Sequence, residues 1–273
     1  MLLRRRNAGA AARRRVAGLE ARLSLSATGT AEVPTLAALN ARLDARHVAG
    51  SGKPIRFVPP QPDDAAGYEA RAWRTGEIVT RPGNWHDADN ALAWIDWPQT
   101  KREVNRQHHL HAPHGEESRR GTARDVLTLF DEDGLVVACA EPSLAELLAG
   151  FRWKELFWTQ RADVMEKMRF HVFGHALAGK LRAPFRGLTA KALVFSVDAA
   201  ELHLPAGGQV AAMDARAAAW LRQPAALSST RVLAPLPVLG IPGWHPDNAR
   251  AEYYDDAGQF RPGRRSRGVH STA

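Results

Sequence analysis

The chain of 273 residues contains a single cysteine, Cys139, so no disulfide can form within it. At this length a hydrophobic core does not depend on disulfides, and the class of small disulfide-bonded secreted domains is excluded. Apolar runs are also short, because charged residues interrupt each of them well before the roughly 20 residues that a membrane helix needs. We therefore expect a protein of the reducing cytoplasm that does not insert into a membrane.

The sequence also lacks the short motifs that mark several large enzyme classes. It has no Gly-rich phosphate loop, no internal repeat and no Gly-x-Ser-x-Gly nucleophile motif. Cys139 lies in an apolar run, VVACA, where a thiol is expected to be buried and unreactive. The sequence therefore gives no support to covalent catalysis by serine or cysteine.

Positive charge is scarce in the middle of the chain and concentrated at its ends. Residues 1–22 carry a net +6 and residues 259–273 a net +4, which leaves −2 of the total of +8 for residues 23–258. A nucleic-acid-binding core would be expected to have a basic face of its own. We predict disordered basic tails at 1–30 and 259–273, a single globular domain at 31–258, and at most weak contact between the tails and nucleic acid.

Apolar spacing in the first half of the chain indicates helices. We expect a helix over residues 32–48, extended chain over 55–81, and then two consecutive helices. The first of these runs from Trp85 to Asp96 with Asn84 as its N-cap, and the second opens at Pro98.

The second half mixes strand and helix signals. Two β-prone runs flank Asp133-Gly134, a dipeptide typical of tight turns, and predict a β-hairpin over residues 125–140. A capping-box pattern at Ser143 then predicts helix to about Leu181 with a break near Trp158. A strand over 192–198 and a short helix that starts at Asp214 are expected to follow. We therefore predict an α+β fold, a mostly helical single domain with a small sheet.

The densest group of candidate site residues lies in the segment NWHDADNALAWIDWPQTK, residues 84–101. On a helix, His86 and Asn90 lie one turn apart with Asp87 beside them, while Lys101 and Asn105 belong to the next helix. Such a group suits a divalent metal or a general acid–base pair. The alternative interpretation is structural, because Asn84 and Asp87 also suit the start of a helix.

Further candidates lie later in the chain. Arg124 and Asp125 either pair with each other or anchor an anionic ligand. His171 and His175 have the spacing of two zinc ligands on one helix turn, but Val172 stands where a zinc protease has its catalytic glutamate. A hydrogen-bonded histidine in the core is the alternative for His175.

Two weaker patterns also involve histidines. The pair His86-Asp87, with His47 upstream and Asp125 downstream, resembles the ligand order of the HD phosphohydrolases, although the predicted hairpin does not suit their all-helical fold. A dense histidine tract suits either adventitious metal binding or a solvated helix end, and comprises His108, His109, His111 and His114.

Four segments together carry a resemblance: NWHDADNALAWIDWPQTK, RDVLTLFDEDG, FGHALAGKLRAPFRGLTA and PLPVLGIPGWHPDN. In this order, over roughly residues 50–260, they resemble the bacterial family known as domain of unknown function 3025. No activity, cofactor or substrate is established for that family, so the resemblance implies membership and not function.

Two hypotheses about function therefore remain open. In the first, the chain is a hydrolase of a small, phosphorylated molecule, with a divalent metal as a candidate cofactor. Its catalytic groups would be His86, Asp87 and Asn90, and its ligand-binding groups Lys101, Asn105, Arg124, Asp125 and His175. In the second, the chain is a non-catalytic binding or scaffolding protein in which the same side chains form a structural polar network.

Overall fold

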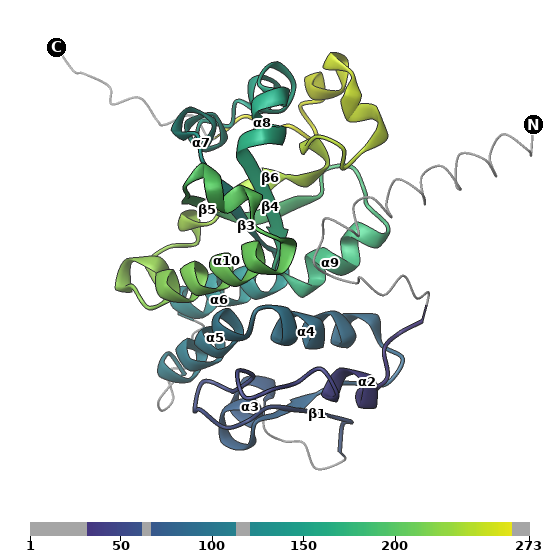
Figure 1. Ribbon diagram of the computed structural model, residues 1–273, viewed down its shortest axis with the longest axis vertical. Helices are drawn as coiled ribbons and strands as arrows, with labels where there is room; N and C mark the ends of the chain where they lie inside the picture. Colours follow the sequence, from purple (N-terminus) through teal and green to yellow (C-terminus); the bar gives the residue numbers. More distant parts are fainter. Residues whose placement is uncertain (1–31, 62–66, 113–120, 264–273) are drawn as a thin grey trace, which may run out of the picture.

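The computed structural model describes residues 32–61, 67–112 and 121–263 of the chain (Figure 1). The predicted tail at 1–30 lies outside the described residues, as does residue 264 onward of the second tail. The chain folds into a mostly helical α+β domain with two small sheets, as predicted. Within the described ranges, no helix has the length and apolar character needed to cross a membrane.

The N-terminal part contains the smaller sheet, in which two strands pair in parallel. Its elements are α2 (Leu36–Asn40), β1 (Arg56–Val58), α3 (Tyr68–Thr75) and β2 (Glu77–Val79). The predicted helix over 32–48 is wrong beyond residue 40, because the following chain turns so that the buried His47 ring can bond to the Ile95 carbonyl. The extended chain predicted over 55–81 is also partly wrong, since it contains α3.

Helices α4 (Trp85–Asp96) and α5 (Pro98–Leu110) form as predicted and lie across the middle of the molecule in Figure 1. Asn84 caps α4 by accepting a hydrogen bond from the Asp87 amide at 3.1 Å. Helix α5 is capped from a distance, because the Asp214 carboxylate accepts from the Gln99 and Thr100 amides at 3.0 and 2.7 Å. Asp214 was predicted to start a helix, but it lies inside α10 (Ala206–Leu221).

The predicted hairpin over 125–140 is wrong. Residues Thr122–Asp133 form helix α6, and strand β3 (Gly134–Cys139) follows it directly. The helical spacing of Val126, Leu127 and Phe130, all fully buried, places one apolar face of α6 in the core. Gly134 has φ of −65°, so no turn requires it. A Cβ atom there would lie 2.2 Å from the Phe130 carbonyl oxygen, so glycine is needed for close packing.

The larger sheet has the strand order β4-β3-β5-β6. Strand β3 pairs antiparallel with β4 (Met168–Val172) and parallel with β5 (Thr189–Ser196), and β5 pairs antiparallel with β6 (Ala234–Pro237). The strand predicted at 192–198 is thus confirmed as β5, which begins three residues earlier.

The predicted break near Trp158 is confirmed, but the helix predicted up to Leu181 is otherwise wrong, because the segment divides into several elements. These are α7 (Pro142–Ala149), a π-helical turn (Glu155–Thr159), α8 (Arg161–Lys167), strand β4 and α9 (His175–Arg182). The N-cap of α7 is Glu141, whose carboxylate accepts from the Ser143 amide, so the predicted capping box is also displaced. Pairing with β3 makes residues 168–172 a strand despite their helical spacing.

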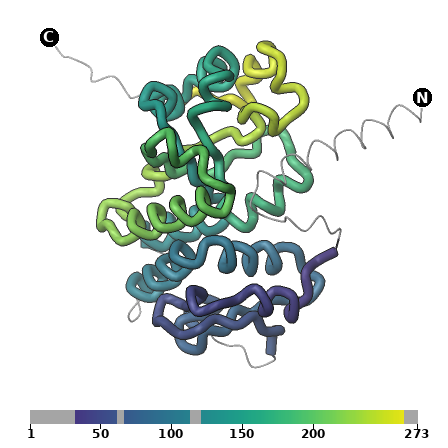
Figure 2. Tube along the Cα trace, in the orientation of Figure 1, coloured from purple at the N-terminus to yellow at the C-terminus, as the bar shows by residue number. Residues whose placement is uncertain are grey.

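The sheet separates two hydrophobic clusters. Leu135 and Val137 face one of them, while Val136 and Ala138 face the other, as expected for alternating side chains of a strand. Helix α10, pale green in Figure 2, lies alongside the blue α5 and joins the two halves of the molecule. Short 3-10 helices complete the fold at Ala199–His203, Pro224–Leu227, Thr230–Val232, Val238–Gly240, Pro246–Ala249 and Ala251–Asp255.

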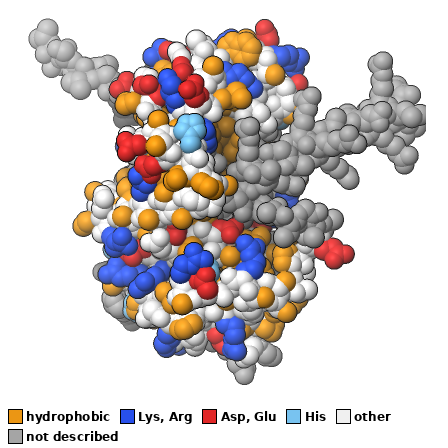
Figure 3. Space-filling view, in the orientation of Figure 1, with side chains coloured by type: hydrophobic (Ala, Val, Ile, Leu, Met, Phe, Trp, Pro, Cys, Tyr) orange, Lys and Arg blue, Asp and Glu red, His pale blue; other side chains and the backbone are white. Residues whose placement is uncertain are grey.

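The C-terminal end of the described chain is folded beyond residue 258. Gln259 and Phe260 are buried, and the Trp153 indole donates a hydrogen bond to the Arg261 carbonyl at 2.8 Å. The tail predicted from residue 259 therefore cannot begin before residue 262. On the face shown in Figure 3, basic and acidic side chains lie interspersed, in keeping with the nearly neutral charge of the middle of the chain.

Candidate active site

A pocket of about 540 Å³ lies between α3, α4, α6 and α9. It brings together five residues predicted from the sequence, namely His86, Asp87, Asn90, Arg124 and His175. The remaining lining residues come mainly from α3, α6 and the loop before α4, and are Pro60, Tyr68, Glu69, Val79, Arg81, His108, Thr128, Asp131 and Glu132. This volume is within the range of small-molecule sites.

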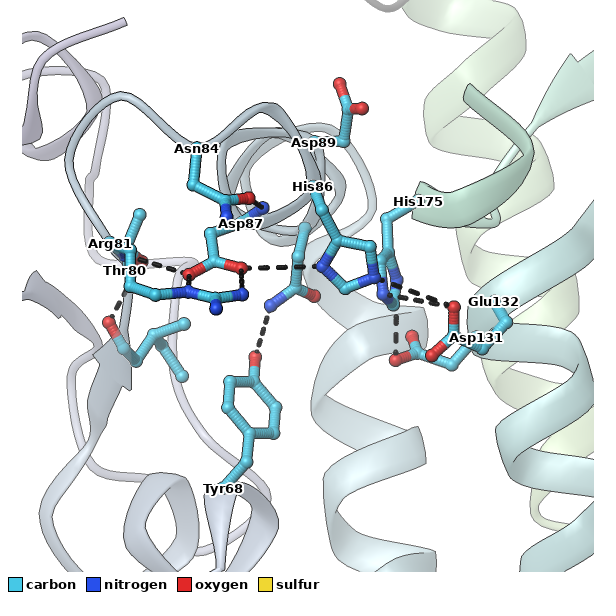
Figure 4. A network of polar contacts seen from close by, with 12 residues as sticks. Tyr68, Thr80, Arg81, Asn84, His86, Asp87, Asp89, Asp131, Glu132 and His175 are labelled. Carbon is cyan, nitrogen blue, oxygen red and sulfur yellow. Dashed lines mark hydrogen bonds and ion pairs between the residues drawn. The ribbon is translucent and has the colours of Figure 1, made fainter. Parts of the chain in front are cut away.

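Two imidazoles and one carboxylate face one another on one side of this pocket (Figure 4). Glu132 Oε2 lies 3.8 Å from His86 Nε2 and 3.6 Å from His175 Nε2, and the rings meet edge to face with centroids 4.7 Å apart. One ligand atom from each of the three side chains lies within 4.8 Å of the others. These three residues are the group in the described chain that could hold a metal ion.

A carboxylate stands behind the Nδ1 atom of His86. Asp87 Oδ1 lies 3.4 Å from that nitrogen, and the carboxylate is itself held by the Arg81 guanidinium through two contacts of 2.8 Å. The Arg81 hydrogen bonds lower the pKa of Asp87 to about 2. Asp87 is therefore a fixed anion at neutral pH that orients the His86 ring.

His175 has an equivalent carboxylate partner in Asp131. Its Nδ1 lies 3.7 Å from Asp131 Oδ2, too far for a hydrogen bond, and this buried nitrogen has no other partner among the described residues. The Lys101 ammonium holds the opposite oxygen, Asp131 Oδ1, at 2.6 Å. Burial, the largest single effect, would raise the pKa of Asp131. The charge and hydrogen bond of Lys101, together with His175 and His108, outweigh burial and leave this pKa below its usual range.

Lys101 and Asn90 belong to a buried network, in which Asn90 also lines the pocket and Lys101 does not. The fully buried ammonium of Lys101 donates to Asn90 Oδ1 at 2.8 Å, and the Asn90 amide donates to the Tyr68 hydroxyl at 2.7 Å. The Trp94 indole donates to the same hydroxyl at 2.8 Å. Because the charge of Lys101 is already neutralised by Asp131, it is not available to a ligand.

Glu69 is the carboxyl group of the pocket that titrates near neutrality. Burial raises the pKa of Glu69 to about 7, and the charge of Lys101 opposes this only in part. The predicted ligand-binding residue Asn105 does not line the pocket but holds Glu69, donating to its Oε2 at 2.6 Å.

Arg124 and Asp125 have different surroundings although they are neighbours in the first turn of α6. Arg124 lines the pocket, and its charge opposes part of the rise in the pKa of Glu69 that burial causes. Its guanidinium forms no ion pair within the described residues. Asp125 was predicted to bind a ligand, but it does not line the pocket.

Of the remaining histidine candidates, His108 lines the pocket, whereas His47, His109 and His171 do not. His171 lies on β4 and lines a separate cavity of about 1070 Å³, so the predicted pairing with His175 on one helical turn is wrong. His47 lines that same separate cavity, so the ligand order of the HD phosphohydrolases is not assembled around His86 and Asp87. In the histidine tract, His109 stacks on the Trp73 indole, while His114 lies outside the described residues.

Several pocket residues were not expected from the sequence. Glu132 and Asp131 escaped notice because their segment suggested a hairpin, in which they would have flanked the turn. Their signal was the helical spacing of Val126 and Phe130, which makes residues 131 and 132 the last turn of α6. Tyr68, Glu69 and Arg81 fell in a stretch without clear periodicity and had no such signal.

The chain matches the model of one known protein family. Residues 55–264 match the family described as "Protein of unknown function (DUF3025)", so the chain belongs to that family. No curated protein and no solved structure gives a significant match.

Proposed function

We propose that this chain is a hydrolase of a small anionic ester, and that its substrate is a phosphate ester bound in the 540 Å³ pocket. The observation that carries the proposal is the composition of the pocket wall, in which Arg124, Glu69 and two imidazoles surround one space. Hydrolysis of an anion requires a cation to bind it, a carboxyl group able to exchange a proton and a concave site. Arg124, which forms no ion pair with the residues that the structure describes, supplies the cation.

Each group has a chemical role that follows from its surroundings. The Arg124 guanidinium offers parallel N–H donors, which suit the oxygens of a phosphate. Because its pKa is about 7, the Glu69 carboxyl is partly ionised at neutral pH and can take a proton from an attacking water. In the reaction, water adds to phosphorus, the ester P–O bond breaks, and the departing oxygen leaves as an alcohol once it is protonated.

A panel of phosphomonoesters, phosphodiesters and carboxylic esters tests this proposal, with release of phosphate or alcohol as the measurement. Arg124→Ala should raise KM for the phosphate substrate at least about tenfold, which corresponds to about 1.4 kcal/mol of lost binding. Glu69→Gln should lower kcat at least about a hundredfold, as expected for a general base. The matched control is Arg102→Ala, an exposed arginine of α5 that does not line the pocket.

Absence of turnover across the whole panel would contradict the proposal, as would equal effects of Arg124→Ala and Arg102→Ala.

The second candidate function is non-catalytic binding. It is favoured by the network of Lys101, Asp131 and Asn90, which is already paired internally and would rigidify a binding site. In that case inorganic phosphate would raise the melting temperature of the wild type and not that of Arg124→Ala, with no product formed.

A further inference from the structure

We propose that His86, Glu132 and His175 form a zinc centre at the wall of the pocket, with at least one coordination position open to it. The inference does not depend on the identity of the substrate, since it follows from the arrangement of three side chains and their neighbours. It assigns to these residues a metal that the sequence left unspecified.

The first argument is the distance between the facing atoms. Glu132 Oε2 lies 3.6 and 3.8 Å from the two Nε2 atoms, which is too long for hydrogen bonds. Four ligands at about 2.1 Å around a tetrahedral zinc ion lie about 3.4 Å from one another. The two Glu132 distances are therefore close to those between ligands of a shared ion. Contraction of the three ligand atoms, which lie within 4.8 Å of one another, would complete the site.

The second argument is that neither ring nitrogen of His175 forms a hydrogen bond within the described residues. The side chain is only 6% exposed, and leaving its buried Nδ1 atom without a hydrogen-bond partner is unfavourable. An ion bound at Nε2 would satisfy one nitrogen, and closure of the 3.7 Å gap to Asp131 would satisfy the other. The unpaired state is thus explained if the ring is a metal ligand.

The third argument is the orientation of both rings. Each histidine has a carboxylate beside Nδ1, Asp87 for His86 and Asp131 for His175, while each Nε2 faces Glu132 (Figure 4). A carboxylate at Nδ1 fixes the tautomer that carries its proton there and leaves the Nε2 lone pair free for a metal.

The anchoring of these two carboxylates strengthens the argument. The Arg81 guanidinium donates two hydrogen bonds to Asp87, and the buried Lys101 ammonium donates one to Asp131. Neither carboxylate is free to swing toward the space between the ligands, so both remain supporting groups. Two imidazoles and one carboxylate make up the ligand set of many catalytic zinc sites, whose remaining position holds water.

The elements that supply the ligands are rigid. His86 lies in the first turn of α4, Glu132 in the last turn of α6, and His175 at the first position of α9. Helices α4 and α9 are tied together by the ion pair of the fully buried Asp89 with Arg182, and α6 and α9 by the ion pair of Asp133 with Lys180. The three ligands are therefore held in place before any ion binds, which favours affinity.

The test is zinc binding by the full chain. The protein is purified, stripped with a chelator and titrated with zinc against a chromogenic competitor, and bound metal is measured by elemental analysis. The expected result is one zinc per chain. In the cobalt-substituted protein, visible absorption typical of a tetrahedral or five-coordinate site is expected.

Glu132→Gln and His86→Ala are the decisive variants, because these side chains are 40% and 54% exposed and their loss should leave the fold intact. Each should lower zinc affinity at least about a hundredfold, since loss of a supporting residue alone typically costs about 10- to 100-fold. Melting temperatures measured without metal confirm that both variants fold. His175→Ala is a third variant, read only if it melts as the wild type does.

The matched control is His111→Ala, which removes an exposed histidine of the tract beyond α5 and should leave one zinc per chain. Absence of stoichiometric zinc, or equal zinc affinity of Glu132→Gln and wild type, would overturn the inference. Loss of zinc in His111→Ala would do the same, because it would assign the metal to the tract. Zinc binding without turnover would contradict the proposed hydrolase and not the zinc centre. Turnover by the metal-free protein would contradict only a role of the zinc centre in that hydrolysis.

Discussion

At the scale of single residues, Glu69 links the ionisation of the pocket to the stability of the fold. Burial raises its pKa to about 7, against the opposing charges of Lys101 and Arg124 and with support from the charge of Asp131. An ordinary glutamate in the unfolded chain has a pKa of about 4.3. The stability due to this group is therefore fully present below about pH 4.3 and is lost as the pH rises through about 7.

Glu69→Gln should consequently stabilise the protein at pH 8 and not at pH 4. A shift of this size corresponds to at most about 4 kcal/mol, and on the order of 1–3 kcal/mol is expected in the free energy of unfolding at pH 8. Urea denaturation at pH 4, 6 and 8 measures it. Glu146→Gln, an exposed change on α7, is the control without such a dependence. An equal difference at pH 4 and pH 8 would show that the carboxyl is not perturbed by burial.

A second prediction at this scale concerns the support of His86. Asp87→Asn replaces the fixed anion at His86 Nδ1 with a neutral amide, so the ring loses the partner that sets its tautomer. Affinity for zinc should fall about 10- to 100-fold with one site per chain retained. Asp125→Asn, outside the pocket lining, should bind zinc as the wild type does. Unchanged binding in Asp87→Asn would leave the carboxylate with only its role at the start of α4.

At the scale of secondary-structure elements, the junction of α6 and β3 is tightly packed close to the site. No side chain fits at Gly134, where a Cβ would lie 2.2 Å from the Phe130 carbonyl oxygen and 2.8 Å from the Phe173 ring. Gly134→Ala should therefore lower the free energy of unfolding by more than about 1 kcal/mol through overpacking, and shift Glu132 with it. Gly207→Ala in α10, where a Cβ meets no atom within 4 Å, is the control and should be neutral or stabilising. Equal stability of the two variants would mean that the junction can open without cost.

The same junction shows why some elements could be predicted and others could not. Helices α4 and α5 carry their own start signals in Asn84 and Pro98, and both were predicted from local sequence. Strand β4 has its partner about thirty residues away, with His171 opposite Val136, and only that pairing turns a helical pattern into a strand. The hairpin prediction failed because Asp133-Gly134 is compatible both with a tight turn and with the end of a helix that is followed by a strand.

At the scale of the whole molecule, the pocket depends on how distant segments meet. His86, Asp87 and Asn90 are close in sequence and were predicted as one group, because helical spacing alone places them together. Glu132 and His175 reach them only when α9 packs against α4 and α6 packs against α9. No local pattern encodes that meeting, so the sequence predicted His175 as a separate candidate and did not indicate Glu132.

The last residues of the described chain also act at this scale, because they fasten the C-terminus to the core. Phe260 is 6% exposed, its ring packs 5.0 Å from that of Tyr254, and the Gln259 amide donates to the Tyr253 hydroxyl at 2.7 Å. The Trp153 indole loses its hydrogen-bond acceptor if Arg261 is removed.

A chain that ends at residue 258 should therefore be less stable than one that ends at residue 263. Burial of a phenylalanine side chain contributes about 1.5–3 kcal/mol and each lost hydrogen bond about 1 kcal/mol, so a loss on the order of 2–4 kcal/mol is expected. For a chain of this size that corresponds to a fall in melting temperature of roughly 5–15 °C.

Both chains should begin at residue 32, so that the predicted N-terminal tail is absent from each. The chain covering 32–263 should melt as the full-length protein does, since the charge and composition of both ends predict that they contribute little to the core. Equal melting temperatures for the two truncated chains would show that Phe260 and Arg261 rest on the core without stabilising it, and a lower value for 32–263 than for the full chain would show that one of the removed ends docks.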